Sequence, residues 1–152
     1  MEPIDIPIAR IMHREYEHVT PATPILEVME KFSERGRHDL IVLGEDGTFM
    51  GVIMLTDILG CLMPHLGVRP GRKTSGMPSG ILCMLLGSGQ AAGDLVTRTN
   101  ITISPGATVG DALARMARDQ HPYLVVVDGA GKAIGCVELA DIIATLRQGG
   151  HL

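Results

Sequence analysis

The chain has 152 residues, the size of one compact domain or of two small repeats, and its 45% apolar and 20% charged residues favour a folded core over disorder. Thirteen Lys and Arg against 17 Asp and Glu give a net charge of −4, which argues against a nucleic-acid-binding surface. The sequence has no Trp, two Phe and two Tyr, too few for a base-stacking platform.

Cellular location is indicated by the cysteines and the apolar stretches. Cys61, Cys83 and Cys136 are an odd number without CxxC spacing, so neither a disulfide framework nor a thiolate zinc site is expected. The segment 1–5 carries acids and a proline where a signal peptide needs basic and then apolar residues. The most apolar stretch, 81–86, is far shorter than the ~20 residues that span a bilayer. We expect a cytoplasmic protein without a membrane span.

The first predicted elements follow one another between residues 19 and 62. Ile25, Val28, Met29 and Phe32 have the i, i+3, i+4, i+7 spacing of an amphipathic helix. The preceding Thr23–Pro24 suits a helix start, through a capping hydroxyl or a proline in the first turn. A strand, a turn, a second strand and a final helix are then expected over residues 40–43, 44–47, 49–53 and 55–62.

Residues 63–91 interrupt this pattern with three prolines, several glycines and the basic residues Arg69, Arg72 and Lys73. The later part, 81–86, is apolar and suits a short helix. Two interpretations are open: it packs on the rest of the chain as a lid, or it forms a surface that faces a partner.

The same elements then return at a fixed offset of 84 residues. Residues 19–59 align with 103–143 without a gap, and eight of the 41 positions are identical. A second amphipathic helix begins near Thr108, followed by strands at 124–127 and 133–137 and a helix at 139–146. Each copy is therefore predicted as strand–helix–strand–strand–helix, and two copies of about 55 residues are expected to pack together to bury their cores.

The repeated unit resembles the cystathionine-β-synthase (CBS) domain, and the chain is similar to a stand-alone CBS-domain pair, or Bateman module. The resemblance is carried by six segments of residues 8–62 and 91–147: Pro21 and Pro105 with the two residues before each, the strand runs 40–43 and 124–128, and the stretches 51–59 and 135–143, each of which begins with a glycine and contains an aspartate. It implies an α+β (α/β) fold of tandem βαββα repeats, packed about a pseudo-twofold axis and joined by the connection 63–91.

The resemblance also implies a regulatory function. Similar proteins bind AMP, ADP, ATP or S-adenosylmethionine in clefts between the repeats, require no cofactor and catalyse no reaction. Two pairs commonly associate through helices, so a homodimer and a regulated partner protein are expected. The alternative is a CBS-pair structural or protein-interaction module that binds no nucleotide.

The two aspartates that begin the last helix of each repeat, Asp57 and Asp141, are the first candidate ligand residues. In the family an acid at this position accepts hydrogen bonds from the ribose hydroxyls. Each is equally an acid in the first turn of a helix, where the macrodipole stabilises negative charge. Both roles remain open.

The neighbouring positions depart from the family pattern, which often has Ser or Thr three residues after the glycine. Met54 and Glu138 stand there instead, so one donor is lost and a carboxylate opposes phosphate. Thr56 still offers a hydroxyl near a helix start, whereas its counterpart is Ala140. The first copy is therefore the more competent, and a cationic ligand such as S-adenosylmethionine is penalised less by Glu138.

The remaining candidate ligand residues flank the first strands of each copy. By resemblance, Thr20 and Thr102 lie where the chain passes the nucleotide, although both also suit a strand edge. The stretches ahead of the buried strands line the base pocket in the family, and Tyr123 either stacks on adenine or fills an empty cleft. These stretches contain His38 and Asp39 in the first copy and Pro122 and Tyr123 in the second.

Other chemistries are not indicated. The six histidines are scattered without HExxH or similar spacing, so no metal site is expected. Neither a GxSxG nucleophile elbow nor a GxxxxGK[ST] phosphate loop is present, and no catalytic residues are predicted.

Overall fold

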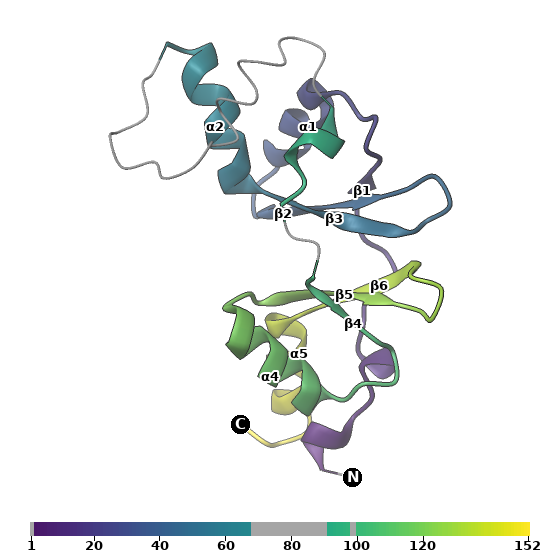
Figure 1. The fold of residues 1–152 in the computed structure, drawn as a ribbon. Helices are drawn as coiled ribbons and strands as arrows, with labels where there is room; N and C mark the ends of the chain where they lie inside the picture. The colour runs from purple at the N-terminus through teal and green to yellow at the C-terminus, as the bar shows by residue number, and fades with distance from the viewer. Residues whose placement is uncertain (1, 68–90, 98–99) are drawn as a thin grey trace. The chain divides into compact units, whose positions relative to one another are not determined.

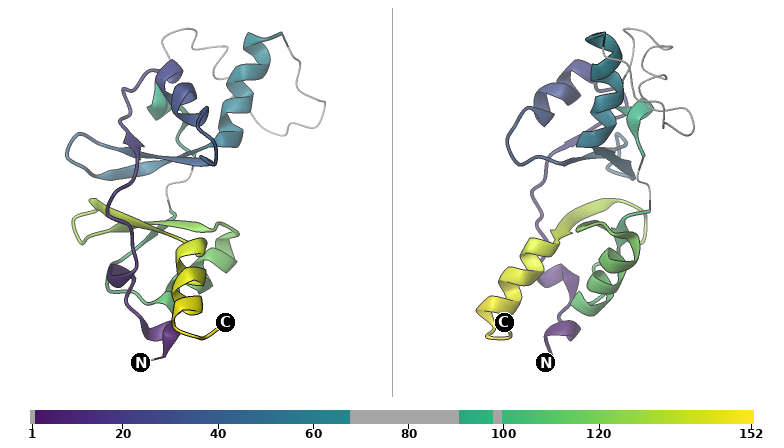
Figure 2. Two further views of the ribbon diagram at one scale, coloured as in Figure 1. Left: turned by 180° about the vertical axis from the view of Figure 1, so that it is seen from behind. Right: turned by 90° about the vertical axis from the view of Figure 1, so that its left-hand side faces the viewer.

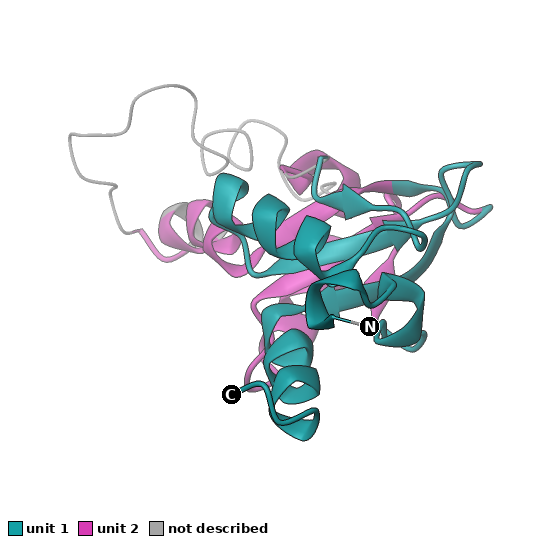
Figure 3. Cartoon of the chain, turned by 90° about the horizontal axis from the view of Figure 1, so that it is seen from below, with its two compact units in different colours: residues 1–16, 46–49, 100–152 teal, residues 17–45, 50–99 magenta. Residues whose placement is uncertain are grey.

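The computed structural model describes residues 2–67, 91–97 and 100–152, and the chain divides into two compact units (Figure 3). Unit 1 contains residues 1–16, 46–49 and 100–152, and unit 2 contains residues 17–45 and 50–99. The basic residues Arg69, Arg72 and Lys73 and the apolar stretch 81–86 lie outside the described residues. Both interpretations of the connection therefore stay predictions.

The first repeat supplies a three-stranded sheet and two helices, shown with their labels in Figure 1. The strands lie in the order β1-β2-β3, and β1 runs parallel to β2 with His18 opposite Ile41. Helices α1 and α2 cover one face of this sheet in every view (Figures 1 and 2). The elements are β1 (His18–Val19), α1 (Ile25–Phe32), β2 (Asp39–Leu43), β3 (Phe49–Met54) and α2 (Leu55–His65).

The second repeat has the same order of elements. Strand β4 runs parallel to β5, and β5 runs antiparallel to β6 with Val125 opposite Cys136. Helices α4 and α5 pack against this sheet on one face. The elements are β4 (Thr102–Ile103), α4 (Val109–Asp119), β5 (Tyr123–Val127), β6 (Ala133–Glu138) and α5 (Leu139–Gln148). The expected βαββα arrangement is confirmed in both repeats.

Helix starts differ in detail from the expectation. Thr108 caps α4 as expected, because its Oγ1 accepts the N–H of Asp111 at 3.2 Å. Thr23 does not cap α1: its Oγ1 accepts the N–H of Thr20 at 3.0 Å, and Pro24 is the residue before the first turn. The proline's fixed φ suits this boundary, so the threonine side chain is free to close the preceding turn.

Each unit is completed by a short leading segment from the other repeat. The 3-10 helices η1 (Pro3–Asp5) and η2 (Ile8–Arg10) belong to unit 1, and η4 (Ala92–Leu95) belongs to unit 2. The Ile8 N–H donates to the Ala107 carbonyl at 2.8 Å in unit 1, and the Ala92 N–H donates to the Thr23 carbonyl at 2.8 Å in unit 2. These two bonds are equivalent under the 84-residue offset.

The core of unit 2 shows why the leading segment matters. Residues from the sheet and both helices gather around Val28 and Ile53, which are fully buried. Ala92 and Leu95 of η4 belong to the same cluster, with 0% and 2% of their surfaces exposed. Burying a leucine stabilises a fold by about 1.5–3 kcal/mol, so the first repeat depends on a segment that precedes the second.

The leading segment of unit 1 passes close to Gly135, in β6. A Cβ at this position would lie 2.7 Å from the His13 carbonyl oxygen and 2.9 Å from the Met12 sulfur. Because the backbone oxygen belongs to the His13–Cys136 pairing, it cannot retreat without breaking that pairing.

Gly135→Ala is therefore expected to lower the free energy of unfolding by about 1–3 kcal/mol, the usual cost of overpacking. Gly129→Ala is the matched control, since a Cβ there meets nothing within 4 Å, and its effect should stay within about 0.5 kcal/mol. Urea denaturation followed by circular dichroism measures both. Equal stability of the two variants would contradict the close approach.

Candidate functional site

The start of α2 is organised around the carboxylate of Asp57. Its Oδ2 accepts the backbone N–H of Met54 at 2.8 Å, which closes the turn from β3 into the helix. The same oxygen accepts the hydroxyl of Thr97 at 2.9 Å, from the leading segment that η4 begins. The Thr97 backbone N–H bonds to the Val52 carbonyl at 3.1 Å, so this segment is fixed to β3. Asp57 is half-buried.

The start of α5 repeats this geometry around Asp141. Its Oδ2 accepts the N–H of Glu138 at 2.8 Å, and its Oδ1 lies 2.5 Å from Nε2 of His13. His13 is fixed to β6 by two backbone bonds with Cys136, of 2.8 and 2.9 Å. The Asp141 side chain is 18% exposed and the His13 side chain 56% exposed. The imidazole therefore remains open to solvent on its outer side.

Thr97 and His13 are equivalent residues that the sequence analysis missed. They are separated by 84 residues, the repeat offset, and they follow directly after the aligned pairs 11–12 and 95–96. Extending the alignment by one residue pairs them, but nothing local in the sequence shows that either side chain reaches an aspartate of the other repeat.

The two aspartates differ in how much of the carboxylate is already engaged. Both bonds of Asp57 fall on Oδ2, and its Oδ1 accepts no hydrogen bond from the described residues. At Asp141 both oxygens are engaged, one by Glu138 and one by His13. Because a carboxylate has two oxygens with about two acceptor sites each, Asp57 keeps more capacity for an external donor.

The loop ahead of β2 lies beside the start of α2. The His38 carbonyl accepts the N–H of Leu55 at 2.7 Å, so His38 and Asp39 are held next to the first turn that carries Thr56 and Asp57. His38 and Thr56 are exposed, and Asp39 is half-buried. Five of the six candidate ligand residues of the first copy thus gather at one end of this sheet: His38, Asp39, Met54, Thr56 and Asp57.

The loop ahead of β5 has the same relation to α5. The Pro122 carbonyl accepts the N–H of Leu139 at 2.9 Å, which brings Pro122 and Tyr123 beside Glu138 and Asp141. Pro122 and Glu138 are exposed, whereas Tyr123 is only 9% exposed. Its ring meets the ring of His121 edge-on, with centroids 6.2 Å apart. The stacking of Tyr123 on adenine stays a prediction.

Thr20 and Thr102 lie apart from these two groups. Thr20 follows the end of β1, and its hydroxyl lies 3.3 Å from that of Thr23. Since β1 runs parallel to β2, this is the end of the sheet opposite to Asp39. Thr102 is opposite Val125 in β4 and faces a groove along α4. Their ligand roles also stay predictions.

Two buried polar side chains, His121 and Cys136, lie in the strand region of the second site. His121 is 4% exposed, and its Nδ1 donates to the Tyr123 carbonyl at 2.9 Å, which requires a proton on Nδ1. Burial raises the pKa of the Cys136 thiol to about 11, so this thiol is uncharged at neutral pH. The His121 side chain therefore holds the β5 backbone at Tyr123 through a hydrogen bond.

Within the described residues, no three or more His, Cys, Asp and Glu side chains are grouped so that they could hold a metal ion. No helix in the same part of the chain is long and apolar enough to cross a membrane.

Two βαββα units with exchanged leading segments, each with an aspartate at the start of its last helix, define the chain as a tandem-repeat module. Residues 8–64 and 92–148 match the CBS domain family, and the chain belongs to this family. The resemblance inferred from the repeat is thereby confirmed, together with the expected fold.

Among characterised proteins, the chain is similar to subunit gamma-3 of 5'-AMP-activated protein kinase. It is 26% identical to the Bos taurus and Homo sapiens proteins over 133 residues, which is 88% of this chain. The match covers 24% and 25% of those two proteins, so the chain spans about a quarter of the length of these relatives.

Solved structures share the fold at low identity. CBSX2 in complex with AMP superposes with a TM-score of 0.75 and 21% identity, covering 95% of this chain and 98% of CBSX2. CBSX2 from Arabidopsis thaliana gives 0.72 and 19%, covering 97% and 98%. The CBS domain of a bacterial CNNM/CorC family Mg2+ transporter in complex with ATP gives 0.68 and 16%, covering 96% and 90%.

The bond between Thr97 and Asp57 predicts a measurable stability effect. Thr97→Val keeps the side-chain shape and removes the donor, so the free energy of unfolding should fall by about 0.5–1.5 kcal/mol. Thr56→Val is the control, because Thr56 is exposed and its hydroxyl makes no hydrogen bond with the described residues, and it should change the free energy of unfolding by less than about 0.5 kcal/mol. Urea titration of the ligand-free chain compares them, and an unchanged Thr97→Val would rule out a stabilising bond.

Proposed function

We propose that this chain is a non-catalytic regulatory module that binds an adenosine-containing ligand, AMP, ADP, ATP or S-adenosylmethionine, and passes its occupancy to a partner protein. The observation that carries the proposal is the arrangement at Asp57. A half-buried carboxylate stands at a helix start, held in place through one oxygen while the other is open. Vicinal ribose hydroxyls are the donors that such a carboxylate accepts in pairs.

The relatives support the same ligand class. The gamma-3 relative carries AMP activation in its name, and related folds have been solved in complexes with AMP and with ATP. In this chain the base-side candidates are His38 and Asp39 with Asp57, and Pro122 and Tyr123 with Asp141. Thr20 and Thr102 complete the proposed set, although they lie at other places in their sheets.

The charge around Asp141 affects the choice of ligand there. Glu138 is exposed beside it, so a polyphosphate would meet a second carboxylate. His13 offsets this only when it is protonated. We therefore propose that Asp57 binds the ribose of the tighter-bound ligand, and that the Asp141 side favours a nucleoside or a cationic ligand such as S-adenosylmethionine.

Calorimetric titration of AMP, ATP and S-adenosylmethionine against the full chain tests this directly. Asp57→Asn keeps an acceptor for Met54 and Thr97 but replaces the other oxygen with a donor. It should weaken binding by about tenfold or more, as expected for loss of a charge-assisted hydrogen bond. Asp141→Asn should have a smaller effect because both of its oxygens are already engaged.

Asp94→Asn is the matched control, since its Oδ2 accepts the Ala91 N–H at 3.0 Å in the same kind of local bond. The Asp94→Asn variant should bind the ligands with the same affinity as the wild type. Binding no tighter than millimolar for all three ligands, or an unchanged affinity of Asp57→Asn, would reject the sensor and favour the alternative, a CBS-pair interaction module without nucleotide. Met54, Glu138 and Ala140 are the residues that support that alternative.

We also propose that the chain forms a homodimer through its helices. Four leucines spaced as one helical stripe along and just beyond α2 are exposed: Leu55 by 38%, Leu59 by 54%, Leu62 by 37% and Leu66 by 69%. On α5, Ile143, the counterpart of Leu59, is 43% exposed. Covering such apolar surface is a common reason for association.

Leu59→Glu places a charge in the middle of this stripe and is expected to convert the dimer to a monomer. Leu26→Glu on α1, where the leucine is 75% exposed outside the stripe, is the control and should leave the mass unchanged. Sedimentation equilibrium of both variants measures the mass. A wild-type monomer at micromolar concentration, or a dimer that survives Leu59→Glu, would contradict the proposal.

A further inference from the structure

Unit 1 has a groove that is separate from the aspartate sites. It lies between the edge strand β4 and helix α4, with a cavity volume of about 570 Å³. Thr102 and Ser104 line it from the strand side, and Arg115 and Arg118 line it from the helix side. Ala107 and Val127 give it an apolar part. This volume lies in the usual range of small-molecule sites, roughly 300–1,000 Å³.

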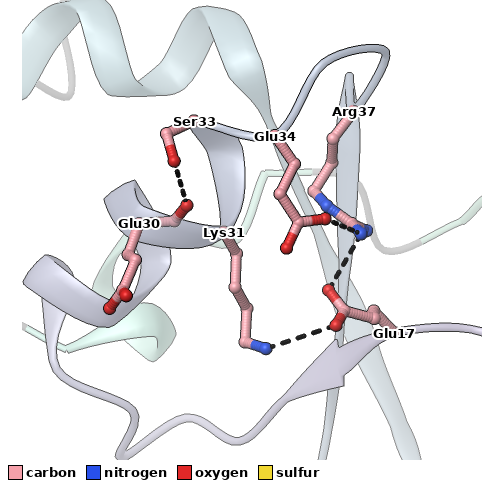
Figure 4. Close-up of polar contacts among 6 residues, drawn as sticks. All are labelled: Glu17, Glu30, Lys31, Ser33, Glu34 and Arg37. Carbon is pink, nitrogen blue, oxygen red and sulfur yellow. Dashed lines mark hydrogen bonds and ion pairs between the residues drawn. The ribbon is translucent and has the colours of Figure 1, made fainter.

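The equivalent place in unit 2 contains internal ion pairs, which Figure 4 shows. Lys31, the counterpart of Arg115, has its Nζ 3.6 Å from Oε1 of Glu17. The Arg37 guanidinium lies 2.9 Å from Glu17 and 2.7 Å from Glu34. The carboxylates of Glu17 and Glu34 therefore neutralise Lys31 and Arg37.

In the second repeat these carboxylates are replaced. Ile101 stands in the position of Glu17, and Arg118 in the position of Glu34, which reverses the charge. Ile101 is fully buried and apolar. The cation of Lys31 is nevertheless kept, as Arg115. The offset thus retains the positive group and removes its carboxylate partner, Glu17.

The contacts of Arg115 agree with this substitution pattern. Its Nη2 donates only to the Asn100 carbonyl, at 3.5 Å, and its Nε is buried with no hydrogen-bond partner among the described residues. A buried guanidinium donor without an acceptor is unfavourable, because it has lost its hydrogen bonds to water and gained none in the protein. In unit 2 the Nε of Arg37 is also unpaired, but its guanidinium already has two carboxylates.

The other charges at the groove have partners of their own. Asp111 accepts the N–H of Thr108 at 2.9 Å at the start of α4, where the helix dipole stabilises its charge. Arg118 pairs with Asp119 through Nε at 3.1 Å and Nη2 at 3.3 Å. Within the described part of this groove, Arg115 is thus the cation without a carboxylate.

We propose that this groove binds a small organic anion, whose carboxylate or phosphate group takes the place that Glu17 fills in the first repeat. The anionic group accepts hydrogen bonds from Arg115 and from the hydroxyls of Thr102 and Ser104, and the body of the ligand contacts Ala107 and Val127. Arginine suits this role because its planar donors match carboxylate and phosphate oxygens. The groove shares Thr102 with the residues of the nucleotide proposal, but it contains neither Asp57 nor Asp141 and can be tested separately.

Nuclear magnetic resonance of the ¹⁵N-labelled full chain tests the groove with two probes, sodium phosphate and sodium succinate. Saturable shifts are expected for the amides of Thr102 and Ser104 and for the Nε–H of Arg115, with at least one probe. Sodium chloride at equal ionic strength controls for screening. The tighter probe identifies the anionic group.

Arg115→Gln should weaken the tighter probe by about tenfold or more, as for loss of a charge-assisted bond. Lys31→Gln is the matched control in the other unit and should leave the affinity unchanged, since Glu17 already neutralises Lys31. Arg118→Glu introduces the acid that Glu34 supplies at this position in the first repeat. Because the Arg118 side chain is exposed, this variant should abolish anion binding while its amide spectrum remains that of a folded chain. Asp57→Asn should retain binding of the anion probe.

Equal shifts with sodium chloride, no saturation with either probe, or an Arg115→Gln variant that binds as the wild type does would overturn the proposal.

Discussion

The exchange of leading segments between the repeats is the constraint on which the rest of the structure depends. Backbone bonds fix residues 8–13 to the second repeat and residues 92–97 to the first. Through them Leu95 completes the core of unit 2, and Ile8 is fully buried in unit 1. The same segments deliver Thr97 to Asp57 and His13 to Asp141. Core packing and site geometry therefore share one cause, and a single repeat contains neither a complete core nor a complete site.

The pseudo-symmetry of the fold is most informative where the side chains break it. Equivalent backbone bonds are kept at both helix starts, at 2.8 Å from Met54 to Asp57 and 2.8 Å from Glu138 to Asp141. The side chains above them differ, a hydroxyl at Thr97 and an imidazole at His13. Among the described residues, the ion pairs of Glu17 with Lys31 and Arg37 likewise have no equivalent in the second repeat, where Arg118 pairs with Asp119. Two copies of one unit thus supply two different chemical environments without a change of fold.

Much of the fold could be predicted because its determinants are local in the sequence. The spacing of Ile25, Val28 and Phe32 predicts α1, and the 84-residue offset extends the prediction to α4. Asp57 and Asp141 could be placed at helix starts for the same reason. Thr97 and His13 could not be assigned to them, because the bonds span 40 and 128 residues and depend on the exchange. The burial of Tyr123, whose ring meets the buried His121 edge-on, is also a tertiary property, which the apolar run of β5 does not specify.

The exchange has a topological consequence. Both ends of the chain belong to unit 1 and appear at the same end of it (Figure 1). In the natural order each leading segment precedes its own repeat and docks on the other. If the two ends were joined and the chain opened ahead of residue 91, the new order would again be leading segment, repeat, leading segment, repeat. Each segment would still dock on the repeat that it does not precede, so circular permutation leaves the connectivity of this fold unchanged.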